Sequence, residues 1–264
     1  IRTDTNCVWK PQHQELWDGA DAISEKKMAG NWNWNIKESF SEPWDFTYTN
    51  PTLNQTLHYE LHWSNNTKNI GIFPEQEANW SWIVEAIKNG PDQPHILNLF
   101  SYNGASTLVA AAAGAKVCHV DSSQSRVRWA RRNQMLNNLE NKPSRWIVED
   151  ATNFVSREVK RDKNSDGIIM DPPAFGRDQK GKPFKFEKHI YQLLELCKKA
   201  LSPKPMFFVF NGYSMGYSAT VLKNLLMDFF PQQKMEFGEL QLAEKNGIRS
   251  LPCSLFARFI AETI

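Results

Sequence analysis

The sequence has no strong excess of charge, few cysteines and no long apolar run. Its 264 residues carry a formal net charge of +2, so no overall positive field marks the chain as a nucleic-acid binder. The four cysteines include no Cys-x-x-Cys pair, which argues against a disulfide framework or a zinc site and is typical of a reducing compartment. No apolar run approaches the about 18 residues of a membrane-spanning helix, and no signal-peptide pattern is recognisable. We therefore expect a cytoplasmic protein with no membrane partner and no metal site.

The first part of the chain, residues 1–74, differs from the rest in its many tryptophans. Apolar and polar residues alternate in 31–36 and again in 57–63, which predicts half-buried antiparallel strands. We expect a β-rich, Trp-containing N-terminal segment over 1–74 and a second domain over 75–264. The tryptophans either form a platform that stacks on bases or fill a small core that needs bulky rings. Because the chain begins with Ile1 rather than Met, we also expect it to be a piece of a longer protein.

From about residue 94 onward, strands alternate with helices. The pattern predicts strands at 96–100, 115–120, 145–148, 167–170 and 206–210, and helices at 105–113, 123–138, 151–161, 187–201 and 217–229. A further helix is expected before them, at 75–88. The last two strands, about 234–243 and 251–260, have no helix between them and should form an antiparallel hairpin. The fold class is therefore α/β, with a Rossmann-like sheet of seven strands.

The first strand of this pattern leads into a turn with a single glycine. Residues 97–104 read Leu-Asn-Leu-Phe-Ser-Tyr-Asn-Gly, followed by an alanine-rich helix. A dinucleotide site needs three glycines for its pyrophosphate, but Tyr102 and Ser106 stand where glycines other than Gly104 would be expected. The lone Gly104 favours a cofactor with adenosine at one end and an amino acid at the other. S-adenosylmethionine is such a molecule.

Acidic residues end the next two strands. Asp121 is placed to accept hydrogen bonds from two ribose hydroxyls, and Asp150 from the adenine amino group. Each aspartate alone is equally suited to cap a helix. Their recurrence at the carboxyl ends of successive strands, where ligands bind in such sheets, favours the cofactor site.

The fourth strand ends in Asp171, Pro172, Pro173 and Phe175. The prolines stiffen the loop and carry no N–H, which leaves the Pro172 carbonyl free to point into the site. A carboxylate and a carbonyl together can hold an amine by its two hydrogens, and Phe175 can stack on the ring that carries the amine. Catalysis would then consist mainly of positioning the nitrogen in line with an activated methyl.

These stretches resemble the class I S-adenosylmethionine-dependent methyltransferases. More narrowly, they are similar to the bacterial branch that includes the large-subunit ribosomal RNA methyltransferases making 5-methylcytosine and 7-methylguanine. Residues 72–76, Ile-Phe-Pro-Glu-Gln, resemble that branch's cofactor motif ahead of the domain. The cofactor contacts expected are Phe73, Gln76, Asn98, Phe100, Tyr102, Asn103, Gly104, Asp121, Ser122, Asp150 and Asp171. The catalytic residues expected are Asp171, Pro172, Pro173 and Phe175.

The sequence departs from the resemblance at two places. Asn98 stands where many class I enzymes have an acid. Methylation at carbon 5 of cytosine needs a cysteine nucleophile, expected near the end of the fifth strand, but residues 210–214 read Phe-Asn-Gly-Tyr-Ser. The cysteines at 118, 197 and 253 are interpreted as packing residues. A nitrogen target is therefore predicted.

Two groups of basic residues lie near these motifs. The arginines on the predicted helix 123–138 are typical of a solvated face. Cations also follow the Asp-Pro-Pro loop, including Lys180, Lys182 and Lys185, and this loop either grips phosphates as a lid or is simply exposed.

The function predicted is S-adenosylmethionine-dependent methylation of a base nitrogen, with ribosomal RNA as the expected substrate and partner. Alternatives are a methyltransferase for a protein or small molecule, an NAD-dependent oxidoreductase on a similar sheet, and a non-catalytic RNA-binding module. The single Gly104 argues against the oxidoreductase.

Overall fold

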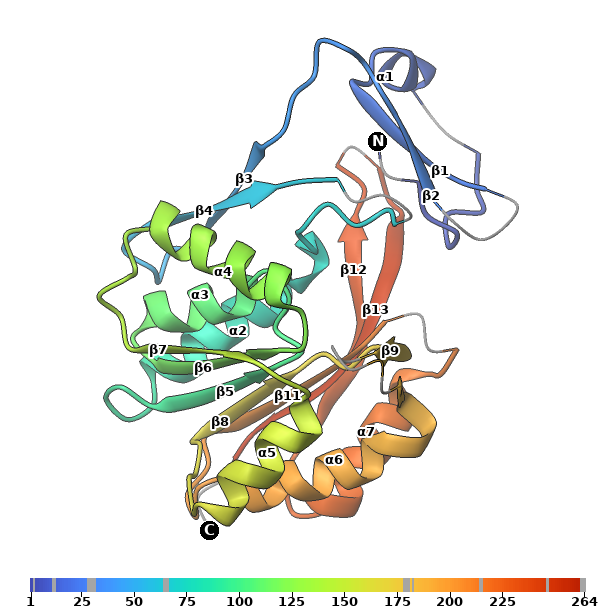
Figure 1. Ribbon diagram of the computed structural model, residues 1–264. Helices are drawn as coiled ribbons and strands as arrows, with labels where there is room; N and C mark the ends of the chain where they lie inside the picture. The colour runs from blue at the N-terminus through green and yellow to red at the C-terminus, as the bar shows by residue number, and fades with distance from the viewer. Residues whose placement is uncertain are drawn as a thin grey trace.

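A seven-stranded sheet forms the centre of the protein (Figure 1). The computed structural model describes residues 1–261 except 2, 11–12, 28–31, 64–66, 178–180, 182, 214–215 and 246. The strands are β5 (His95–Leu99), β6 (Lys116–Asp121), β7 (Ser144–Val148), β8 (Gly167–Met170), β11 (Phe207–Gly212), β12 (Glu236–Ala243) and β13 (Ser250–Ile260). Five of them are mutually parallel, whereas β13 runs antiparallel to both β11 and β12. The predicted Rossmann-like sheet with a final antiparallel hairpin is confirmed.

The order of the strands determines where a ligand can bind. The sheet reads β12-β13-β11-β8-β5-β6-β7, so the chain moves outward from β5 through β6 and β7, then returns to the other side of β5 with β8. In open α/β sheets this reversal opens a crevice at the carboxyl ends of the strands. The loops after β5, β6, β7 and β8 therefore converge there.

Helices cover both faces of the sheet (Figure 1). They are α2 (Glu77–Lys88), α3 (Ala105–Ala113), α4 (Gln124–Leu136), α5 (Ala151–Lys160), α6 (Phe186–Ala200) and α7 (Ala219–Phe229). Successive strand residues alternate between two cores: Phe207 and Val209 pack with α2 and α3, whereas Phe208 and Phe210 pack with α5, α6 and α7. None of the helices in the described part of the chain is long and apolar enough to span a membrane.

The N-terminal part forms two separate two-stranded sheets. Its elements are α1 (Gln14–Asp18), β1 (Ala22–Lys26), β2 (Trp32–Ile36), β3 (Trp44–Thr49), β4 (Thr56–Leu61) and the 3₁₀ turn η1 (Pro74–Gln76). The β3–β4 hairpin joins the core of α2 and α3, where Tyr59 stacks on Trp80 with ring centroids 6.3 Å apart. Trp44 and Trp63 pack on each other at 5.2 Å. These two tryptophans fit the interpretation of a small core.

A short hairpin follows β8 and was not predicted. It pairs β9 (Phe175–Arg177) with β10 (Pro183–Lys185), directly before α6. Lys180 and Lys182 of the expected lid lie outside the described residues, so the lid stays a prediction.

Candidate functional site

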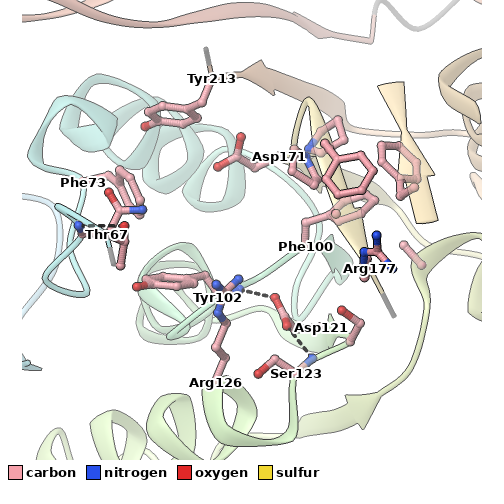
Figure 2. Close-up of a pocket in the computed structure, with 18 of the residues that line it drawn as sticks. Thr67, Phe73, Phe100, Tyr102, Asp121, Ser123, Arg126, Asp171, Arg177 and Tyr213 are labelled. Carbon is pink, nitrogen blue, oxygen red and sulfur yellow. Dashed lines mark hydrogen bonds between the residues drawn. The ribbon is translucent and has the colours of Figure 1, made fainter. Parts of the chain in front are cut away.

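A cavity of about 890 Å³ opens at the carboxyl ends of β5, β6, β7 and β8 (Figure 2). The expected site residues that line it are Phe73, Phe100, Tyr102, Asp121, Ser122, Asp150, Asp171, Pro172, Pro173 and Phe175. They come from loops far apart in the sequence, which the strand order brings to one edge of the sheet. The structure thus gathers most of the expected site around one cavity.

The loop after β5 is shaped by backbone that L-residues rarely adopt. Phe100 and Tyr102 have φ values of +57° and +50°, and Gly104 has +87°. A Cβ on Gly104 would lie 2.8 Å from the Cβ of Ala130, so only glycine allows α4 to approach this closely. The resulting turn points Tyr102 into the cavity, where the guanidinium of Arg126 lies 4.7 Å from its ring (Figure 2).

Asp121, the last residue of β6, is held rigidly at the cavity wall. One carboxylate oxygen accepts from the backbone N–H of Tyr102 at 2.9 Å and the other from that of Ser123 at 2.8 Å (Figure 2). Burial raises the pKa of Asp121, while these hydrogen bonds and Arg126 favour the charged form. Each oxygen has a further lone pair for a hydroxyl donor, as two ribose hydroxyls require.

Asp150 caps a helix, as its position directly before α5 predicts. Its Oδ1 accepts from the backbone N–H of Asn153 at 2.9 Å, which caps the N-terminus of α5. The residue also lines the cavity. A carboxylate has enough acceptor sites to cap a helix and to bind an amine, so both interpretations of Asp150 stand together.

Asp171 is an acidic residue of the site whose surroundings disfavour its charged form. The residue is half-buried, but its Oδ1 is shielded from solvent and has no hydrogen-bond partner within the described part of the chain. Burial, followed by the charge of Glu75, raises the pKa of Asp171 to about 7. Pro173 is fixed by a bridge to Tyr213, whereas Phe175 is 53% exposed at the cavity mouth. A donor or cation entering the cavity would satisfy Asp171.

Some of the expected contact residues stand behind the cavity wall rather than on it. Those that do not line the cavity are Gln76, Asn98, Asn103 and Gly104. Asn98 shows the physical reason, because side chains alternate along β5 and its amide points toward α3, where it donates to Thr107 at 2.9 Å. Its role is therefore to join the strand to the helix.

The other two side-chain amides support loops that do line the cavity. Gln76 donates to the Tyr213 hydroxyl at 3.0 Å, and Asn103 donates to the Gly71 carbonyl. Both contacts join segments that are distant in sequence, which suits a supporting role in the wall.

Several lining residues were not expected from the sequence. Glu75 and Tyr213 lie beside Asp171, and Cys253 of β13 also reaches the wall, although it was interpreted as a packing residue. The N-terminal part contributes Trp32 and Lys68, whose ammonium lies 5.4 Å from the Trp32 ring. Of these five residues, Glu75 had a usable sequence signal, since it directly precedes Gln76 in the motif at 72–76. Among the residues described, no group of three or more His, Cys, Asp or Glu side chains is arranged to hold a metal ion.

The side chains present fit S-adenosylmethionine. Asp121 offers fixed acceptors of the kind that ribose hydroxyls need, and Asp150 offers a further acceptor at the same cavity. The Oδ1 of Asp171, which has no hydrogen-bond partner among the residues that the structure describes, and the neighbouring Glu75 provide negative charge at another part of the wall. This charge suits a cofactor that carries positive charge at its amino-acid end.

Comparison with known proteins gives a close structural relative. A SAM-dependent methyltransferase from Agrobacterium tumefaciens is 34% identical, with a TM-score of 0.88, and the match covers 96% of this chain and 81% of that one. A methyltransferase from Streptococcus mutans has a TM-score of 0.70 at 19% identity, covering 94% of this chain and 63% of that one, and shows the fold alone. No protein-family model matches the chain.

A curated relative matches a shorter stretch. It is the ribosomal RNA large subunit methyltransferase K/L of Shewanella sp. (strain ANA-3), 36% identical over 112 residues, which are 41% of this chain and 16% of that protein. The matched stretch is thus a small part of that relative's length. The predicted cofactor class is confirmed by the near full-length relative, and the chain belongs to the class I SAM-dependent methyltransferases.

Proposed function

We propose that the chain methylates a nitrogen of an RNA base, and that its substrate is ribosomal RNA. The observation that carries this proposal is Asp171, whose buried Oδ1 has no partner among the described residues and belongs to a loop stiffened by Pro172 and Pro173. A carboxylate oxygen in this state suits an N–H donor, such as the exocyclic amine of a base.

The cofactor, when bound, supplies a methyl group already activated by its sulfonium sulfur. The chain's own contribution is then to position the acceptor. Asp171 accepts a hydrogen bond from the target amine, the Pro172 carbonyl accepts a second, and Phe175 stacks on the ring. Burial and the charge of Glu75 raise the pKa of Asp171 to about 7, which suits it to take up the amine's proton near neutral pH.

The mouth of the cavity has groups that suit a nucleic acid. The exposed ring of Phe175 lies 5.7 Å from the guanidinium of Arg177, so an aromatic face and a cation stand together beside the Asp-Pro-Pro loop. Bases stack on such rings, and phosphates attract such cations. The name of the Shewanella relatives, ribosomal RNA large subunit methyltransferase K/L, supports a ribosomal RNA substrate.

A carbon target is the second candidate, and Cys253 is the observation that favours it. The segment after β11 has no cysteine at the expected place, but Cys253 reaches the same cavity from β13. Its thiol donates to the Leu251 carbonyl at 3.3 Å. Methylation at carbon 5 would need this thiol as a nucleophile, whereas methylation of a nitrogen would not.

The test incubates the protein with methyl-labelled cofactor and unmodified ribosomal RNA, then maps the labelled nucleoside. We expect label on a base nitrogen, lost in Asp171→Ala while calorimetry still detects cofactor binding. Asp228→Asn, an exposed acid on α7, serves as the matched control and should keep full activity. Absence of label from RNA, or full activity of Asp171→Ala, would refute the proposal. Label at carbon 5 that disappears in Cys253→Ser would establish the second candidate instead.

A further inference from the structure

The N-terminal part of the chain forms one wall of the cavity. Three of its segments line the cavity: residues 4–6, Trp32 of β2 and residues 67–69. In Figure 2, Thr67 lies near Phe73, across the view from Arg177. The motifs that end the strands of the sheet include none of these segments, and the function proposed above gives this wall no task.

Trp32 differs in its surroundings from other tryptophans of the N-terminal part. Trp44 and Trp63 pack on each other, and the indole N–H of Trp34 donates to the Thr67 carbonyl at 2.9 Å. Trp32 is only half-buried, and it lines the cavity. An indole ring that stays partly open to a cavity leaves apolar surface in contact with water, which a ligand can cover. This position favours a ligand-binding role for Trp32 over a packing role.

Hydrogen bonds hold the β1–β2 hairpin that carries Trp32. The backbone N–H of Thr3 donates to the Ser24 hydroxyl at 3.1 Å, and the Thr3 hydroxyl donates to the Ser24 carbonyl at 2.7 Å. Asn6, three residues further along, donates to the Pro252 carbonyl of β13 at 3.0 Å. Residues 3–6 therefore tie the hairpin to the central sheet, which gives Trp32 the rigid support that a binding group needs.

Lys68 orients the ring of Trp32. Its ammonium lies 5.4 Å from the centre of the ring and also pairs with Asp4. A cation over an aromatic face is attracted by the electron density of the ring, so this contact favours one orientation of the indole. Because the ring is half-buried and lines the cavity, part of it remains accessible to a ligand.

The strand order places this wall toward the acceptor end of the cavity. Asp121 and Asp150, which suit the ribose and the adenine of the cofactor, come from the ends of β6 and β7 at one edge of the sheet. The strand that Asn6 contacts, β13, lies toward the other edge, beyond β8 and β11. Figure 1 likewise shows the β1–β2 hairpin near the ends of β12 and β13. Asp171 follows β8, on the same side of β5 as β13.

We propose that Trp32 stacks on a base of the RNA substrate. Every base has a flat face, so an aromatic ring can bind a nucleic acid without selecting one base. Trp32 would then act as a specificity-determining residue that favours nucleic acids over other acceptors, and the N-terminal part would supply it. This inference rests on the RNA substrate proposed above.

The test measures steady-state methylation of unmodified ribosomal RNA by wild type, Trp32→Leu and Trp32→Phe. Loss of one stacked base should lower kcat/KM of Trp32→Leu by about 5- to 150-fold, mainly through a higher KM for RNA. Trp32→Phe keeps an aromatic ring and should recover most of this loss. The slope of log KM against log salt should stay as in wild type, because no charge is removed. Trp17→Leu, at a half-buried tryptophan of α1 outside the cavity lining, should behave as wild type.

Two results would overturn the assignment. An unchanged KM for RNA in Trp32→Leu would mean that the ring does not contact the substrate. Binding of S-adenosylhomocysteine that weakens by the same factor as KM rises would mean that the residue only shapes the cavity.

A fluorescence measurement decides if Trp32→Leu fails to fold. RNA should quench the tryptophan emission of wild type, and Trp32→Phe should show less quenching, whereas equal quenching would overturn the assignment. Wild type that places no label on RNA would refute the proposed function together with this inference. Label on RNA with an unchanged KM in Trp32→Leu would refute this inference alone.

Discussion

Replacing Asp171 by asparagine should stabilise the protein at alkaline pH. The pKa of Asp171 is raised from 3.8 to about 7 in the folded chain, so the folded state binds this proton more tightly than the unfolded state. The stability that the proton contributes is full below about pH 4 and is lost as the pH rises through about 7. At 1.36 kcal/mol per pH unit, the difference amounts to at most about 4 kcal/mol.

The assay is urea denaturation of wild type and Asp171→Asn at pH 5 and pH 8. Asparagine resembles the protonated acid and carries no charge at either pH, so the variant should exceed wild type in stability by a larger margin at pH 8. The exposed control Asp228→Asn should show the same margin at both values. Comparing one protein with another at each pH cancels the titration of all the other groups.

Two results would contradict this prediction. Asp171→Asn could be no more stable than wild type at pH 8, or the difference in stability between the two proteins could be the same at pH 5 and pH 8. Either result would mean that Asp171 is already satisfied in the ligand-free protein. Glu75→Gln provides an independent check, because removing that charge should lower the pKa of Asp171. The pH at which the stability contributed by the Asp171 proton is lost should then also be lower. The direction of that movement separates the effect of charge from the effect of burial.

Three further predictions concern residues that line the cavity or support its wall. Gly104→Ala should lower the free energy of unfolding in urea by about 2 kcal/mol or more, because the position combines a positive φ with a Cβ contact of 2.8 Å to Ala130. Gly114→Ala, which has a positive φ but no contact within 4 Å, should lower it less. Asp150→Ala should lose about 1 kcal/mol of stability through the missing cap, while Asp150→Asn should keep the cap and weaken cofactor binding in calorimetry. Cys253→Ser should retain methyl transfer to RNA if the target is a nitrogen.

The succession of strands and helices along the chain could be predicted from the sequence because the pattern of apolar residues that marks each element is local. A strand buried on both faces is mostly apolar, as in β8 and in residues 207–210 of β11, and a helix between two such strands has one apolar face. The antiparallel final hairpin followed from the absence of a helix between its strands. The short β9–β10 hairpin gave no such signal, because three-residue strands are too brief to show a period.

The candidate site could be predicted only where strand direction determined it. Asp121 is the last residue of a parallel strand, and Asp150 and Asp171 follow two others, so their convergence at one edge is a consequence of topology. Asn98 was expected at the same edge, but it lies within β5 rather than after it. The pleat points its side chain toward α3 instead. Position along a strand decides which residues reach the ligand.

The chemical state of Asp171 depends on residues that its own motif does not contain. Glu75 raises its pKa from the turn before α2, and Tyr213 stands beside it from the end of β11. The hydrogen bond between Gln76 and Tyr213, which are 137 positions apart, joins those two segments. A motif can show that a carboxylate ends a strand. Whether that carboxylate is charged, and which group it receives, is decided by tertiary contacts, so the same Asp-Pro-Pro sequence in another environment would perform different chemistry.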